Sequence, residues 1–190
     1  MWGDTGISTW ILENVSIYPG LNEFLKILLL INSFGLLWLI PMGIFIYLDF
    51  KKYKRIDFSY LLFLLTTIIG VGLIAFVLQP IFARPHPYET IEGFAKLNED
   101  LNINITKYSL PSISAYTSIA YSFFLTIKKK DYSTYYFIAA FIMCISELIL
   151  GVSYLSDIIF GRGLGALFGG LGNLFQDKMI KFLTSVGVLK

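Results

Sequence analysis

The chain has 190 residues, of which 56% are hydrophobic and only 15% are charged, and its mean hydropathy is +0.69. A soluble domain carries about 25% charged residues, so this composition excludes an ordinary soluble protein and predicts an integral membrane protein in one domain, 1–190. The formal net charge of +2 gives no indication of a nucleic-acid partner, and the lone Cys144 excludes an intrachain disulfide.

The N-terminal segment, residues 1–24, mixes apolar and polar side chains. Within it, the apolar residues of 7–18 predict a short helix that lies in the membrane interface and ends at Pro19 and Gly20. A loop that wraps the outer end of the helix bundle is the alternative interpretation.

Five apolar stretches are long enough to cross a bilayer core of about 30 Å. They predict an all-α fold, a polytopic membrane bundle of about five transmembrane helices. The predicted spans are residues 27–48, 58–83, 111–127, 132–152 and 158–176.

The connecting segments differ in charge between the two sides of this predicted bundle. Basic residues gather at 51–55, at 128–130 and near the C-terminus, whereas most acidic residues fall on the other side. Because a basic excess marks the cytoplasmic face, we expect the N-terminus outside and the C-terminus in the cytoplasm. The glycosylation sequons at Asn14 and Asn104 then lie outside.

The outer connection 84–110 is much longer than the usual loop of about 4–6 residues, and such a length is typical of a functional lid. Pro85 and Pro87 at its start and Pro111 beyond its end fix the points where it meets the membrane. The apolar spacing within 90–101 predicts a short amphipathic helix, with a plain loop as the alternative.

Three polar motifs lie at the predicted outer ends of the spans. They are Gln79 with Arg84-Pro-His86-Pro, then Ser109-Leu-Pro-Ser112-Ile-Ser114-Ala, and then Ser146-Glu147-Leu-Ile-Leu-Gly-Val-Ser153-Tyr-Leu-Ser156-Asp157. In order, spacing and membrane depth, they resemble the three signatures of the type 2 phosphatidic acid phosphatase superfamily, membrane enzymes related to the vanadium haloperoxidases. The resemblance covers about residues 22–175 and implies the helical scaffold of those enzymes.

The resemblance also implies what each motif does in that family. The histidine of the third signature is the nucleophile and forms a phosphohistidine, and the aspartate four residues later orients it. The histidine of the second signature protonates the leaving group, while a lysine and two arginines bind the phosphate. In this chain, Ser112 and Asp157 match the family pattern.

The positions that handle phosphate are the ones at which this chain departs from the family. Ser153 stands at the nucleophile position, Ser114 at the general-acid position, and Gln79, His86 and Glu147 at the three cationic positions. A serine without an adjacent base is a weak nucleophile, and a carboxylate repels phosphate. The degenerate pocket therefore predicts that no residue is catalytic.

Two residues of this pocket have alternative interpretations. Because an ionisable group within a membrane usually has a partner, Glu147 is predicted to form a salt bridge with Arg84 or Arg162 that closes the old pocket. Alternatively, Glu147 builds a small-cation or proton site with Asp157 and the serines. The only histidine, His86, is expected to be a hydrogen-bonded surface group and not a catalytic residue or metal ligand. We expect no metal centre and no cofactor.

Glycines recur every four residues in the last predicted span, at Gly161, Gly165 and Gly169. Small residues at this spacing let membrane helices approach closely. They predict helix packing, either inside the bundle or against a partner.

The leading functional hypothesis is a catalytically silent relative of membrane lipid phosphate phosphatases. Such a protein would act as an accessory or structural subunit of a membrane complex, or as a binder of an isoprenoid or other lipid. Its partners would be membrane lipids and other membrane protein subunits. The alternatives are an active lipid-phosphate or polyprenyl-diphosphate phosphatase with rearranged catalytic residues, and a small-cation or proton carrier that uses Glu147.

Overall fold

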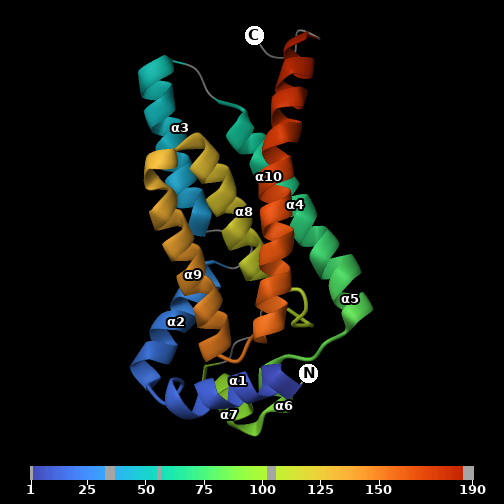
Figure 1. Ribbon diagram of the computed structural model, residues 1–190. Helices are drawn as coiled ribbons and strands as arrows, with labels where there is room; N and C mark the ends of the chain where they lie inside the picture. Colours follow the sequence, from blue (N-terminus) through green and yellow to red (C-terminus); the bar gives the residue numbers. More distant parts are fainter. Residues whose placement is uncertain (1, 33–36, 55–56, 102–105, 186–190) are drawn as a thin grey trace.

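A computed structural model describes residues 2–32, 37–54, 57–101 and 106–185 (Figure 1). Most of these residues are helical and none of them lies in a strand, which confirms the all-α fold. A π-helical turn, Ile74–Leu78, joins α4 to α5, and a 3-10 turn, Lys130–Tyr132, precedes α9. The α-helices are α1 Trp2–Asn14, α2 Pro19–Ile31, α3 Leu39–Tyr53, α4 Ser59–Leu73, α5 Gln79–Phe82, α6 Pro87–Thr90, α7 Glu92–Leu101, α8 Ile113–Lys128, α9 Ser133–Ile149 and α10 Leu155–Ser185.

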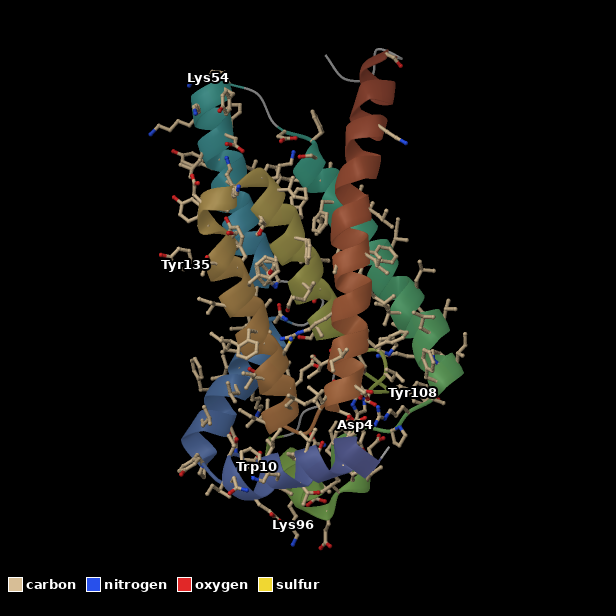
Figure 2. The ribbon with its side chains drawn as sticks, viewed as in Figure 1. Asp4, Trp10, Lys54, Lys96, Tyr108 and Tyr135 are labelled. Carbon is tan, nitrogen blue, oxygen red and sulfur yellow. The ribbon has the colours of Figure 1, made fainter. Side chains whose placement is uncertain are left out.

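The long helices α3, α4, α8, α9 and α10 run along the bundle, while α1, α6 and α7 lie across one end of it (Figure 1). Helix α10 ends at the opposite end. Trp10, on α1, and Lys96, on α7, therefore lie far from Lys54, which follows α3 (Figure 2). We call the end that carries α1 and α7 the lid end.

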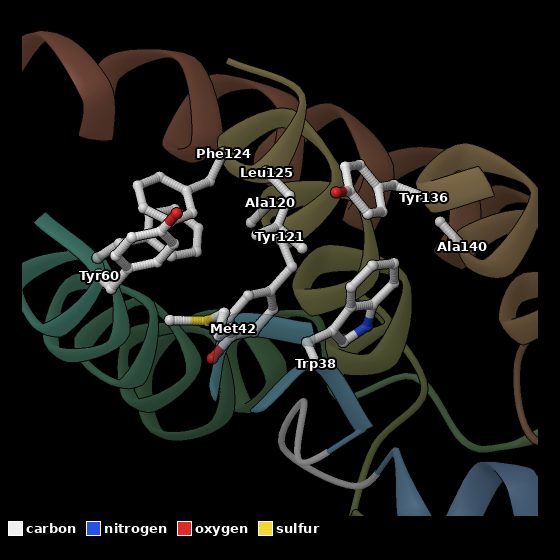
Figure 3. Packing of buried hydrophobic residues seen from close by; sticks show 10 residues of the cluster. Trp38, Met42, Tyr60, Ala120, Tyr121, Phe124, Leu125, Tyr136 and Ala140 are labelled. Atoms are coloured by element: carbon white, nitrogen blue, oxygen red, sulfur yellow. The ribbon is translucent and has the colours of Figure 1, made fainter. Parts of the chain in front are cut away.

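An aromatic core holds the middle of the bundle together (Figure 3). Phe63 of α4 stacks on Phe124 of α8 with ring centroids 4.1 Å apart, and Trp38 stacks on Tyr121 at 6.0 Å. Stacked aromatic pairs contribute about 0.5–1.5 kcal/mol beyond the burial of their surface. These contacts fix α3 and α4 against α8.

Much of the outer surface of the bundle is apolar, with Phe76, Ile81 and Ile69 each more than half exposed. Two helical stretches of the described chain, Ser59–Thr90 and Lys130–Ile149, are long and apolar enough to cross a membrane. They correspond to the predicted spans 58–83 and 132–152. The total of five spans stays a prediction.

The prediction of one continuous helix over residues 27–48 is wrong. Helix α2 ends at Ile31, and α3 begins only at Leu39; residues 33–36 are outside the described chain. Pro41 falls in the first turn of α3, where proline is tolerated because no intrahelical bond is lost. Asn32 caps α2 and is fully buried, and its side chain donates to Ser114.

The two segments that lie across the lid end, for which a loop was the alternative prediction, are both helical. Helix α1 spans Trp2–Asn14, which is longer at its start and shorter at its end than the predicted 7–18. Residues 90–101 contain α7, Glu92–Leu101, as predicted. The sequon residue Asn14 is exposed at the end of α1, whereas Asn104 lies outside the described residues.

The glycines of the last helix pack inside the bundle. A Cβ added at Gly161 would collide with the Ser112 carbonyl oxygen, and one at Gly165 would collide with the Tyr116 carbonyl oxygen. At Gly169 it would lie 2.8 Å from Phe123. All three contacts are with α8, so these glycines set the close approach of α10 to α8.

The effect of Gly165→Ala on stability tests this packing. Because the added methyl meets backbone atoms that cannot move cheaply, we expect a loss of about 1–3 kcal/mol in the free energy of unfolding. Gly163→Ala is the matched control, since nothing lies within 4 Å of its Cβ and alanine favours a helix by about 1 kcal/mol. In detergent, the unfolding temperature should fall for Gly165→Ala and rise for Gly163→Ala. Equal shifts in the two variants would contradict this packing.

Candidate functional site

The three polar motifs meet at the lid end of the bundle. Gln79 begins α5, Ser112 is the N-cap of α8, and Glu147 lies in the last turn of α9. A short turn then returns the chain through Ser153 to α10. Gly151 in this turn has φ of +65°, a conformation that suits glycine, and its missing Cβ leaves room for the Phe94 ring.

A small cavity lies where these elements meet. It leaves about 20 Å³ for the centre of a water-sized sphere, which is room for about one water molecule. Its polar lining comes from all three motifs and from the lid segment: Gln79, Thr106, Ser109, Ser112, Ser114, Glu147 and Ser153. Five of the seven predicted pocket positions line this cavity, which is nearly filled by their side chains, whereas His86 and Asp157 are not among its lining residues.

The Glu147 carboxylate is surrounded by hydroxyl groups. Its side chain is only 3% exposed, and its Oε2 accepts a hydrogen bond of 2.6 Å from Ser112 Oγ. The Ser112 hydroxyl itself accepts from the Ala115 backbone N–H at 3.0 Å, so its proton is directed to the carboxylate. The hydroxyls of Ser114 and Ser153 also approach Glu147.

The predicted salt bridge of Glu147 is absent from the described chain. Arg84 pairs with Asp157 Oδ1 at 2.6 Å and with Asp4 Oδ2 at 3.0 Å, and its guanidinium lies 4.0 Å from the centroid of the Tyr154 ring. Arg162 donates to Cys144 Sγ at 3.2 Å. Because other groups engage both arginines, the Glu147 carboxylate has no ion-pair partner among the described residues.

Asp157 is held by groups other than an imidazole. Its Oδ1 accepts from Arg84, and its Oδ2 accepts from the Tyr154 backbone N–H at 2.9 Å. Its backbone carbonyl accepts from the Ser112 N–H at 3.2 Å. With 0% exposure, this aspartate ties the start of α10 to the N-terminus of α8.

His86 is buried, which corrects the expectation of a surface histidine. It is 1% exposed, and its two ring nitrogens lie 2.5 Å from the Val152 carbonyl oxygen and 2.9 Å from the Thr106 carbonyl oxygen. Its ring also stacks on Tyr88 with centroids 4.7 Å apart. These contacts join the lid segment to the turn after α9, and His86 does not line the cavity.

Two amides place further polar groups around the cavity. Gln79 donates through Nε2 to the Pro111 carbonyl oxygen at 3.0 Å. Asn32 donates through Nδ2 to Ser114 Oγ at 2.9 Å and to Ser118 Oγ at 3.2 Å. Ser114 therefore connects the cavity to the end of α2.

Helices α1 and α7 cover this site through apolar contacts. Phe94 of α7 is fully buried against Gly151, and Leu12 of α1 packs against Gly93. Ser16, just beyond α1, donates a hydrogen bond of 2.6 Å to the Ile149 carbonyl oxygen at the end of α9. Helices α1 and α7 are thus fixed over the cavity.

Sequence reasoning missed two residues of this site, Asp4 and Asn32. Asp4 lies beside the start of α10 (Figure 2), where it pairs with Arg84 and accepts from Ser156 Oγ at 2.5 Å. Its acidic charge at the predicted outer side was the only signal for this role. Asn32 falls within residues 27–48, which the sequence predicted as one continuous span. Its polarity within an apolar stretch was the available signal.

No cluster of three or more His, Cys, Asp or Glu side chains that could hold a metal occurs in the described part of the chain. The site offers one isolated buried carboxylate, hydroxyl groups and amides. These groups can donate hydrogen bonds or ligate a small cation through oxygen, but they provide neither an imidazole nor a guanidinium for phosphate.

The comparisons with known proteins agree with this architecture. A sequence profile described as the PAP2 superfamily matches residues 60–181. The fold is similar to a crystal structure of a transmembrane PAP2-type phosphatidylglycerolphosphate phosphatase from Bacillus subtilis, with a TM-score of 0.65 and 24% sequence identity. This match covers 93% of this chain and 85% of that chain, and at such identity it shows the fold alone. No curated protein sequence matches the chain.

Asp4→Asn should release α1 from the lid end. The substitution removes the charge that holds Arg84 and Ser156, and a hydrogen bond to a charged group is worth about 1.5–3 kcal/mol. We expect amide hydrogen exchange in α1 to accelerate about ten- to hundredfold at neutral pH. Glu13→Gln, at an exposed position of the same helix, is the matched control and should leave exchange unchanged.

The tether formed by Asp4 should also depend on pH. Burial acts to raise the pKa of Asp4, but hydrogen bonds from Ser156 and Arg84 and the charge of Arg84 lower this pKa below its ordinary value of 3.8. A lowered pKa means that the ionised carboxylate favours the docked helix above pH 3.8 and that this advantage is lost as the pH falls further. The ratio of exchange rates between Asp4→Asn and wild type should therefore approach one in acid. A ratio that does not change with pH would contradict the assignment.

Proposed function

Because the chain belongs to the PAP2 superfamily, we propose that it is a catalytically silent member of that family. It is a membrane protein with the scaffold of a lipid phosphatase that serves as an accessory or structural subunit, or as a lipid binder. The observation that supports this most directly is the buried Glu147 carboxylate, which stands in the cavity without a cationic partner among the described residues.

Electrostatics argue against phosphate binding in this cavity. Two like charges 4 Å apart repel each other by about 4 kcal/mol at an effective dielectric constant of 20, and a phosphate carries up to two charges. Cationic groups usually stabilise a transferring phosphoryl group and are worth about 10³-fold or more in rate, but no lysine or arginine is found among the described residues that line the cavity. Glu147 therefore disfavours both the substrate and the transition state.

The size and chemistry of the cavity argue in the same direction. The space suits about one water, whereas a phosphate has four oxygens of similar size. The nucleophile position holds Ser153, and the described residues that line the cavity include no imidazole to act as its base. His86 is held by two backbone carbonyls outside the cavity, so it offers no support for a rearranged phosphatase.

A lipid or a protein partner would therefore bind on the outer surface of the bundle and not in the cavity beside Glu147. An apolar groove of about 440 Å³ on α10, lined by Ile159, Phe160 and Leu167 among others, is such a surface. Native mass spectrometry after gentle detergent extraction separates the two roles. A monomer that retains lipid favours the lipid binder, and a stable hetero-assembly favours the subunit.

Orthovanadate and lipid phosphates test the proposed loss of activity. We expect the purified full chain to show no binding heat with millimolar orthovanadate and no release of phosphate from phosphatidic acid or polyprenyl diphosphate, because Glu147 repels the anion. A PAP2-type phosphatase of confirmed activity is the positive control. Phosphate release by the purified wild-type chain would overturn the proposal.

We also infer that the lid end faces outside and that the opposite end faces the cytoplasm. The opposite end carries the basic residues Lys51, Lys52 and Lys54, and ion pairs join Lys128 to Asp57 at 3.1 Å and Lys129 to Asp49 at 2.6 Å. A basic excess of this kind marks the cytoplasmic face of membrane proteins.

Cysteine labelling in intact cells tests this orientation. Cys144 is buried and should give no background with a membrane-impermeant maleimide. Lys96→Cys, in α7, should be labelled because it is exposed outside, and Lys54→Cys, after α3, should be labelled only when the cells are opened. The reverse pattern would invert the topology.

A further inference from the structure

Three carboxylates, those of Asp4, Glu147 and Asp157, and one guanidinium, that of Arg84, lie in the buried or partly buried part of the lid end among the described residues. Arg84 lies between Asp4 and Asp157 and is shared by both carboxylates. Glu147, which is almost fully buried, contacts no lysine or arginine in the described part of the chain. Taking an isolated charge out of water is unfavourable, so a carboxylate in this position is stabilised either by a proton or by a bound cation.

The groups around Glu147 are the ligands that a small hard cation prefers. Besides the carboxylate, the cavity is lined by the hydroxyls of Ser112, Ser114 and Ser153. Gln79, whose Nε2 donates to the Pro111 carbonyl, also lines the cavity and carries a side-chain amide oxygen. The site therefore presents oxygen atoms and no nitrogen or sulfur ligand, which excludes a preference for softer transition metals.

The charge and volume of the cavity select the kind of cation. Divalent ions such as Ca²⁺ take six to eight oxygen ligands, commonly from several carboxylates, whereas this cavity has one carboxylate and room for one water-sized particle. Asp157 does not contribute, because Arg84 and the Tyr154 N–H occupy its oxygens. We propose that the cavity binds one small monovalent metal cation of about the size of Na⁺, with Glu147 as its charged ligand.

This inference rests on the proposed loss of phosphate binding, because a pocket that holds a phosphate needs the opposite charge. A cation site would also explain in one way the residues at which this chain departs from the family pattern. Replacement of cationic and imidazole side chains by a carboxylate, an amide and hydroxyls converts an anion pocket into an oxygen-lined cation site.

Thermal unfolding of the full chain in sodium-free detergent buffer tests the site. Because a cation that binds only the folded state stabilises it, we expect NaCl to raise the unfolding temperature by about 5–10 °C at a hundredfold excess over Kd. The increase should saturate and should be larger with Na⁺ or Li⁺ than with K⁺. Choline chloride at equal ionic strength should have no such effect. No difference between NaCl and choline chloride would overturn the proposal.

Glu147→Gln identifies the ligand, because it removes the charge while preserving the size of the side chain and an acceptor for Ser112. We expect this variant to remain folded, with an unfolding temperature in sodium-free buffer at or above that of wild type, and to lose the response to Na⁺. Glu92→Gln, at an exposed carboxylate of α7, should keep the full response. A Na⁺ response that survives in Glu147→Gln would place the ion elsewhere and refute the proposal.

Failure of this inference can be told apart from failure of the proposed function. If the chain neither binds orthovanadate nor responds to Na⁺, it is catalytically silent and the cation site alone is wrong. If it hydrolyses lipid phosphates, the proposed function is wrong whatever the Na⁺ response.

Discussion

A buried carboxylate beside three serine hydroxyls determines what the lid end of this bundle can bind. The Glu147 side chain lies where a membrane phosphatase of similar sequence pattern would need positive charge, and the arginine nearest in the motifs, Arg84, is committed to two aspartates. Electrostatic interactions are strong where water is excluded. The negative charge of Glu147 therefore affects ligand binding in the cavity more than the similarity of the scaffold does. The site is consequently suited to a cation or to a neutral hydrogen-bonding partner, and unsuited to an anion.

Several residues of the family pattern make packing contacts in this scaffold. Gly161, Gly165 and Gly169 let α10 lie against the backbone of α8, and Gly151 makes the turn on which Phe94 packs. Asp157, which would orient a nucleophile in the enzymes, here ties α8 to α10 through its backbone and side chain. A residue that matches a catalytic motif can therefore also contribute to packing. This is why a shared fold does not establish a shared activity.

The sequence predicted the helical class and the positions of the later helices because long apolar stretches and turn residues are local signals. It missed the break near Asn32, since its partners Ser114 and Ser118 lie more than 80 residues away. For the same reason it could name Arg84 as a charged residue of the site but not choose its partners Asp4 and Asp157. The burial of His86 likewise depends on two backbone carbonyls that no motif encodes. Motif spacing located the pocket, while its closure depended on contacts between distant segments.

The contacts of Asp4 have a consequence for the order of events during synthesis. Its side chain pairs with Arg84, 80 residues later, and with Ser156, 152 residues later. At a ribosomal rate of about 5–20 residues per second, α1 emerges roughly 8–30 s before its last anchor has been made. Helix α1 thus leaves the ribosome well before the segment that secures it, and in the interval it depends on the bilayer surface or on a chaperone to shield its apolar side chains.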